Sequence, residues 1–135
     1  MKNLKSALVI GVLALMTSCD LGPGYVSYTN VQIYISSKNI PSTGIVNQAM
    51  QINAECYAPN DCWYGLKVNL LKKDDLHYHL FAIGNYTSTG NCNDIEVAAD
   101  TTISFTPTAA GSYVFTTWLS PSETINDTVT VTTAP

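Results

Sequence analysis

Arginine is absent from this 135-residue chain, and basic residues of any kind are scarce. Beyond position 19, four lysines stand against ten aspartates and glutamates, a formal balance of −6. Nucleic acids and phosphate groups are bound mainly by clustered basic side chains and by the two-pronged guanidinium of arginine. The composition therefore argues against nucleic acid as a partner, and also against a polybasic membrane-binding surface.

Motifs that carry catalysis are missing as well. The chain has no Gly-x-Ser-x-Gly turn, no phosphate-binding glycine loop and no His-Glu-x-x-His. Asp74 and Asp75 are neighbours, so they lie in a turn or on opposite faces of a strand, and neither arrangement makes an acid and base pair. We expect no enzymatic activity and no cofactor.

No apolar run is long enough to span a bilayer, and the longest, Ala7–Met16, has another explanation. Lys2 and Lys5 precede it, and small or polar residues lead from it to Cys19, which is the pattern of a signal peptide. The segment Leu15–Cys19 resembles the lipobox of bacterial lipoproteins, whose cysteine is acylated and becomes the mature N-terminus. We expect a signal peptide at 1–18, a lipidated tether at 19–25 and one domain at 26–135.

This resemblance implies a protein of the cell envelope, anchored by its lipid, most simply at the outer membrane. Surface-exported proteins that this segment resembles often carry several charges directly after the cysteine, whereas here only Asp20 is acidic, so the resemblance favours the periplasmic side over the cell surface. The alternatives are an ordinary cleaved secretory signal with a chance cysteine at its end and, more remotely, an uncleaved anchor.

The remainder of the chain is rich in Thr, Val, Ile and Tyr that alternate with period two, and no helical periodicity lasts beyond one turn. This predicts an all-β domain of two packed antiparallel sheets, with Met50, Ile52, Ala54 and Cys56 among the inward residues. Val129 and Val131 point inward on the last strand, and Thr128 points outward. The seven expected strands are Tyr28–Ser36, Gln48–Tyr57, Gly65–Leu71, His77–Ile83, Thr101–Thr106, Ser112–Leu119 and Asp127–Thr132.

The second half of the domain carries a Phe-x-Pro motif at Phe105, then Gly-x-Tyr-x-Phe from Gly111 to Phe115, then Asp-Thr-Val-Thr-Val from Asp127. This order resembles the immunoglobulin-like domains of exported lipoproteins from Bacteroidetes-type bacteria. The resemblance spans about residues 56–131. It implies an immunoglobulin-like β-sandwich in the envelope, with Tyr113 and Phe115 on one face of a central strand, and it implies no particular activity.

With Cys19 lipidated, three cysteines remain for an oxidising compartment, so one thiol is left over. We expect Cys56 to be a buried free thiol and Cys62 to pair with Cys92 between two loops, and the resemblance implies the same pairing. Pairing of Cys56 with either of the others stays open at this point.

Few side chains are candidates for a site. His77 and His79 lie on one strand face, as in some zinc sites, but no second ligand cluster supports a metal, and an exposed edge strand is the simpler interpretation. Trp63, Tyr64 and Trp118 are aromatic residues for contact with a protein or a glycan, unless Trp63 covers the disulfide and Trp118 packs under a loop.

Two further resemblances concern loops and modification. Asn39–Ile45 resembles the inhibitory loop of chagasin-type cysteine protease inhibitors, but Ile40 interrupts the motif and a plain turn explains it better. Thr101 and Thr128 each follow an aspartate, as in the acceptor sequence for O-glycosylation in Bacteroidetes-type bacteria.

Taken together, these features of the sequence predict a lipid-anchored binding or structural module, with a protease inhibitor or an accessory domain of an envelope enzyme or assembly as the alternatives.

Overall fold

The computed structural model describes residues 24–135, and these residues form eight β-strands and no helix. The all-β prediction is thus confirmed. The predicted signal peptide, Cys19 and most of the predicted tether lie outside the described residues. Within residues 24–135, no helix is long and apolar enough to cross a membrane. The strands are β1 (Val26–Asn39), β2 (Thr43–Ile45), β3 (Met50–Ala58), β4 (Trp63–Lys72), β5 (His77–Ser88), β6 (Val97–Phe105), β7 (Gly111–Ser120) and β8 (Glu123–Thr132).

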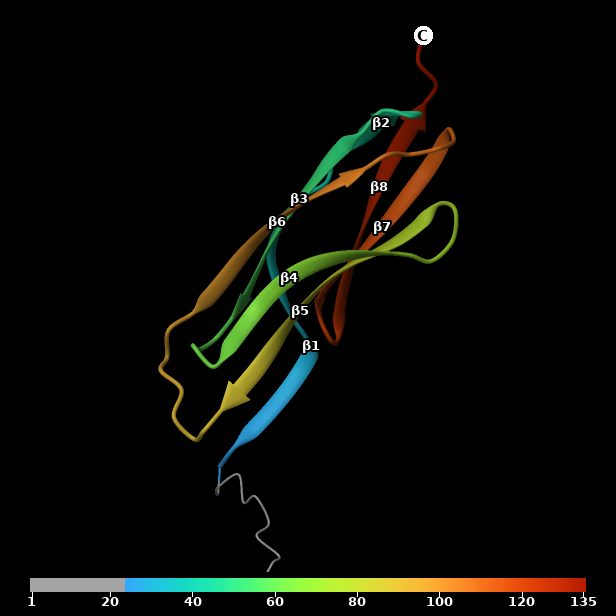
Figure 1. The fold of residues 1–135 in the computed structure, drawn as a ribbon. Coiled ribbons are helices and arrows are strands. Elements are labelled where there is room, and N and C mark those ends of the chain that lie inside the picture. Colours follow the sequence, from blue (N-terminus) through green and yellow to red (C-terminus); the bar gives the residue numbers. More distant parts are fainter. Residues whose placement is uncertain (1–23) are drawn as a thin grey trace, which may run out of the picture.

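The strands build one continuous sheet that curls into a half-barrel (Figure 1). Its order is β2-β8-β7-β5-β1-β3-β6, and β4 pairs with the other edge of β5. The β5–β7 and β2–β8 pairs are parallel, so the prediction of purely antiparallel pairing is wrong. Two separately packed sheets are likewise not what this topology shows, because β1 belongs to both halves of the curled sheet.

β1 makes the curl possible by changing its partner along its length. Its first half pairs with β5 from Val26 to Ile33, and its second half pairs with β3 from Tyr34 to Asn39. The register shifts after Tyr28, near Asn30 with its φ of 53°, and again after Ile35. Such bulges bend a strand and strengthen its twist, which turns β3 and β6 over the inner face of β5.

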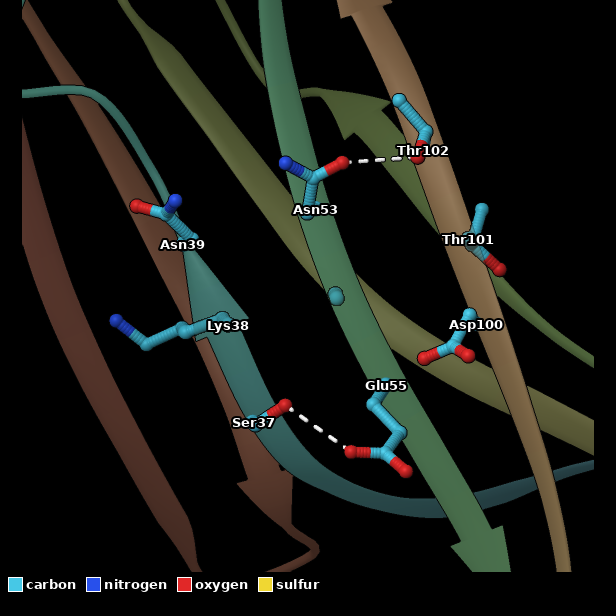
Figure 2. A pocket seen from close by; sticks show the side chains of 9 residues that line it. Ser37, Lys38, Asn39, Asn53, Glu55, Asp100, Thr101 and Thr102 are labelled. Carbon is cyan, nitrogen blue, oxygen red and sulfur yellow. Dashed lines mark hydrogen bonds between the residues drawn. The ribbon is translucent and has the colours of Figure 1, made fainter.

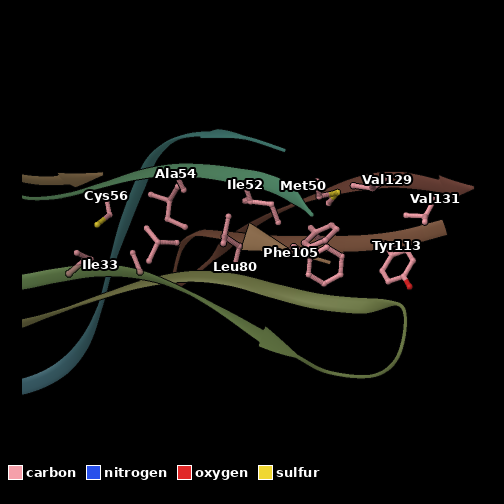
Figure 3. Close-up of a cluster of buried hydrophobic side chains, with 14 residues drawn as sticks. Ile33, Met50, Ile52, Ala54, Cys56, Leu80, Phe105, Tyr113, Val129 and Val131 are labelled. Carbon is pink, nitrogen blue, oxygen red and sulfur yellow. The ribbon is translucent and has the colours of Figure 1, made fainter. Parts of the chain in front are cut away.

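The alternation predicted from the sequence places the core correctly. Ile52, Ala54 and Cys56 point from β3 toward Leu80 of β5 and Ile33 of β1 (Figure 3). On the other half of the core, the aromatic and aliphatic residues of the C-terminal strands are buried as expected, namely Phe105, Tyr113, Phe115, Val129 and Val131. Thr128, Thr130 and Thr132 are exposed, which completes the predicted pattern of β8.

The segment between β1 and β3 differs from the expected plain turn. Thr43–Ile45 forms the short strand β2 beside β8, and the Thr130 amide donates to the Ser42 carbonyl at 3.0 Å. Lys38 at the end of β1 also makes an ion pair with Asp127 of β8. These contacts fasten the end of β1 to the far edge of the sheet.

Candidate functional site

The most developed surface feature is the outer face of β1, β3 and β6. Tyr34 of β1 lies opposite Tyr57 of β3, and their rings stack with centroids 5.8 Å apart and an angle of 23° between the planes. Since side chains alternate along β3, Glu55 and Asn53 follow Tyr57 on the same face. Opposite them on β6 stand Asp100 and Thr102, and we call these six residues the tyrosine–carboxylate strip.

Hydrogen bonds order the polar part of this strip. The Ser37 hydroxyl donates to the Glu55 carboxylate at 3.2 Å, and the Thr102 hydroxyl donates to the Asn53 side-chain oxygen at 2.8 Å. Figure 2 shows Glu55 and Asp100 opposite each other on neighbouring strands, with the Glu55 carboxylate turned toward Ser37. A shallow open depression of about 310 Å³ lies over this region.

A larger cleft of about 730 Å³ adjoins the tyrosine end of the strip. Tyr34 and Tyr57 line one side of it, and Leu119 and the β7–β8 turn line the other. The turn contributes the hydroxyls of Ser120 and Ser122 and the carboxylate of Glu123. The surface therefore combines flat aromatic faces with many oxygen atoms that accept hydrogen bonds.

The strip carries negative charge, and few basic side chains lie near it. Lys38 borders the depression, but its ammonium group is directed to Asp127. The charge also acts on the core side of β3, because burial, assisted by Asp100 and Glu55, raises the pKa of the Cys56 thiol. Cys56 is buried and free, as the sequence predicted.

The predicted disulfide is confirmed, since Cys62 is bonded to Cys92 with a Cα–Cα distance of 5.5 Å. It joins the β3–β4 turn to the β5–β6 connection. Beside it, the Asn93 amide and side chain donate to the Asp61 carboxylate at 2.8 and 2.6 Å, and these bonds lower the pKa of Asp61.

The three aromatic residues singled out from the sequence do not form one surface. Trp63 is half-buried beside the disulfide and packs edge-on against Tyr86, with centroids 5.2 Å apart, while Tyr64 is exposed beside it on β4. Trp118 is half-buried on β7, and its ring centroid lies 6.0 Å from that of His79. Tyr34 and Tyr57, which the sequence did not single out, make the better aromatic platform.

The two histidines are held by separate contacts. His77 Nδ1 lies 2.8 Å from the Asp74 carboxylate, whereas His79 faces Trp118. Hydrogen bonds from the Leu76 amide and from His77 keep the pKa of Asp74 below its usual value. Asp74 is thereby occupied with closing the β4–β5 turn, and nowhere in residues 24–135 do three His, Cys, Asp or Glu side chains gather to hold a metal ion.

The two threonines proposed as glycosylation sites differ in their surroundings. Thr128 is exposed on β8. Thr101 is half-buried, and its hydroxyl accepts a hydrogen bond from the Val68 amide at 3.3 Å. Thr128 is thus the more accessible acceptor, and its modification stays a prediction.

The segment Asn39–Ile45, which resembles an inhibitory loop, is held in place by strand pairing. Its residues Thr43–Ile45 run along β8, so the segment does not project as a free loop. Comparisons with protein-family models, with curated proteins and with solved structures found no match for this chain. Its function must therefore be inferred from its own residues.

Proposed function

We propose that this chain is a lipid-anchored binding domain of the bacterial envelope, and that it holds neutral glycans on the tyrosine–carboxylate strip. The observation that carries the proposal is the stacked pair of the exposed Tyr34 and the half-buried Tyr57, beside a row of carboxylate, amide and hydroxyl groups. The proposed anchor is an acylated Cys19, with the domain on the periplasmic side of the outer membrane.

The chemistry of the strip matches that of a sugar chain. A sugar ring has an apolar C–H face that packs on an aromatic ring, and its rim of hydroxyls donates hydrogen bonds to carboxylate and amide oxygens. Carboxylates are the stronger acceptors, which favours Glu55 and Asp100 as the groups that orient the ligand. The open depression and cleft suit an extended chain better than a small molecule, which needs an enclosing pocket.

Charge narrows the ligand class. Glu55 and Asp100 belong to the strip and Glu123 lines the cleft, while Lys38 is paired with Asp127. Sulfated or uronic-acid polymers would be repelled by these carboxylates. Neutral hexose polymers are not repelled by these carboxylates, and they are the proposed ligands.

The half-barrel also supports an immunoglobulin-like interpretation of the fold, which remains part of the proposal. β3 and β6 lie across the core from β5, and the buried Tyr113 and Phe115 come from β7, a strand with neighbours on both sides. In this interpretation the two layers of a sandwich stay joined through β1.

Replacing Tyr34 with alanine is expected to weaken glycan binding about tenfold, or ~1.4 kcal/mol, because one stacking face is lost. The test measures binding of the mature protein to neutral glucans and mannans, with heparin as the anionic comparison. Tyr28→Ala is the matched control, since Tyr28 is also exposed and stacked on another tyrosine, Tyr86, at the other end of β1. Binding of heparin alone, or equal losses in both variants, would refute the glycan site.

Replacing Cys19 with alanine is expected to leave an unprocessed precursor or to release the domain from membranes, because acyl chains provide the anchor. Fractionation of cells that express the variant checks this. The intact mass of the native protein gives an independent measurement, with the expected value being the chain from Cys19 plus lipid. A sugar-sized addition would further support modification of Thr128, and a mature N-terminus elsewhere would exclude the anchor.

A further inference from the structure

The exposed apolar side chains of this domain are concentrated at one end. Eight large hydrophobic residues are exposed within residues 24–135, and five of them belong to this end: Tyr25, Val26, Tyr28, Tyr64 and Ile95. They come from the start of β1, the start of β4 and the β5–β6 connection. Figure 1 shows the start of β1 beside the end of β5, and the disulfide joins the other two segments.

Several of these rings are held in fixed positions. Tyr28 stacks on Tyr86 with centroids 6.2 Å apart, and Tyr86 in turn meets the edge of Trp63 at 5.2 Å. The Tyr86 hydroxyl donates to the sulfur of Cys92 at 3.5 Å. The three contacting rings come from β1, β5 and β4, and Tyr28 is the most exposed of them. A rigid aromatic cluster of this kind inserts without losing side-chain freedom.

The position of Cys19 in the sequence brings this end close to a membrane. Five residues separate Cys19 from Tyr25, so even a fully extended tether spans only about 20 Å. An acyl chain on Cys19 would therefore hold Tyr25 and the start of β1 within that distance of the headgroups. Tyrosine is favoured there, because its ring is apolar and its hydroxyl remains hydrated.

Charge decides which lipid surface fits. Asp61, Asp94 and Glu96 are exposed at this end. The four lysines after Cys19 are elsewhere, in the second half of β1, in β4 and in the β4–β5 turn. An anionic bilayer would repel these carboxylates, whereas zwitterionic headgroups would not.

We propose that this end, defined by Tyr25, Val26, Tyr28, Tyr64 and Ile95, sits in the headgroup layer of a zwitterionic bilayer. The inference rests on the lipid anchor in the proposed function. Docking at this end stands the strands upright on the membrane, and it leaves the carboxylate part of the tyrosine–carboxylate strip farther from the headgroups than Tyr57, which lies near the end of β3. Attraction to lipid then comes from aromatic and aliphatic burial, with electrostatics opposing it on anionic surfaces.

Hydroxyl-radical footprinting of the lipidated protein tests this orientation. The protein is reconstituted in phosphatidylcholine–phosphatidylethanolamine vesicles, and oxidation of each tyrosine is compared with that in the Cys19→Ala protein in buffer. Tyr64 and Tyr34 are an internal matched pair, with exposed fractions of 50% and 48%. We expect oxidation of Tyr28 and Tyr64 to fall about fivefold or more on vesicles, because the headgroup layer excludes bulk water, while Tyr34 is unchanged.

The possible outcomes distinguish a failure of membrane docking from a failure of the lipid anchor. If the protein floats with the vesicles but Tyr28 and Tyr64 are oxidised as fast as in buffer, docking is refuted and the anchor stands. If the protein does not float, the anchor fails and docking fails with it. In vesicles that contain phosphatidylglycerol, protection should weaken at low salt and recover as salt screens the carboxylates. Stronger protection at low salt would contradict the proposal.

Discussion

Replacing Phe115 with alanine is expected to lower the free energy of unfolding by about 3–5 kcal/mol, the largest effect of any single core truncation in this domain. Phe115 is fully buried on β7. Its ring centroid lies 5.2 Å from that of Phe105 and 5.5 Å from that of Tyr78. Truncation removes the ring at the centre of this cluster, and a closely packed interior cannot collapse fully into the space that it leaves.

Urea denaturation of the full chain, followed by fluorescence, measures this loss. Val114→Ala is the matched control, because Val114 is the preceding residue on the same strand and lies half-buried on its outer face. We expect the control to cost about 1 kcal/mol or less, since it removes fewer carbon atoms than the loss of a phenyl ring, and removes them from a partly hydrated site. Similar losses in both variants would mean that the inward face of β7 is assigned wrongly.

The inward and outward faces could be predicted because alternation is a local property of each strand. β3 and β8 show this most clearly, since every residue predicted to be buried there is buried. The neighbours of each strand could not be predicted in the same way. The parallel β5–β7 pair and the change of partner in β1 depend on contacts between distant segments, and an alternating pattern looks the same in parallel and antiparallel pairs.

The short strand β2 was missed for a related reason. Pro41 and Gly44 are typical of turns, and only the neighbouring β8 makes an extended conformation favourable at Thr43–Ile45. Tertiary pairing here overrides local preference.

The tyrosine–carboxylate strip illustrates the same limit for function. Tyr34 and Tyr57 are separated by two turns and a strand, and they become one platform only through the register of β1 and β3. Glu55 and Asp100 meet through the register of β3 and β6. The sequence pointed to the tryptophans because large rings are common at binding surfaces, but Trp63 is half-buried against the core and Tyr86. The sequence favoured the observed disulfide, because the alternation of β3 placed Cys56 inward and the other two cysteines of the domain lie in loops, but only the structure excludes a bond to Cys56.

Removing the disulfide by the double change Cys62→Ser and Cys92→Ser is expected to lower the free energy of unfolding by about 3–4 kcal/mol. The two cysteines are 30 residues apart, and the bridge restricts the unfolded chain across the whole of β4 and β5. The loss should appear as a lower urea midpoint with a similar dependence on urea. Reduction of the wild-type disulfide should give the same midpoint shift, which separates the effect of the bridge from that of the serines.

Cys56 provides the control and a second readout. Cys56→Ala keeps the disulfide and removes only a small buried group, so we expect it to cost about 1 kcal/mol. In the folded wild-type protein the Cys56 thiol should react slowly with maleimide, because it is buried and its raised pKa keeps it protonated. Fast labelling would contradict the inward face of β3, and a non-reducing peptide map that links Cys56 to Cys62 or Cys92 would contradict both that face and the pairing.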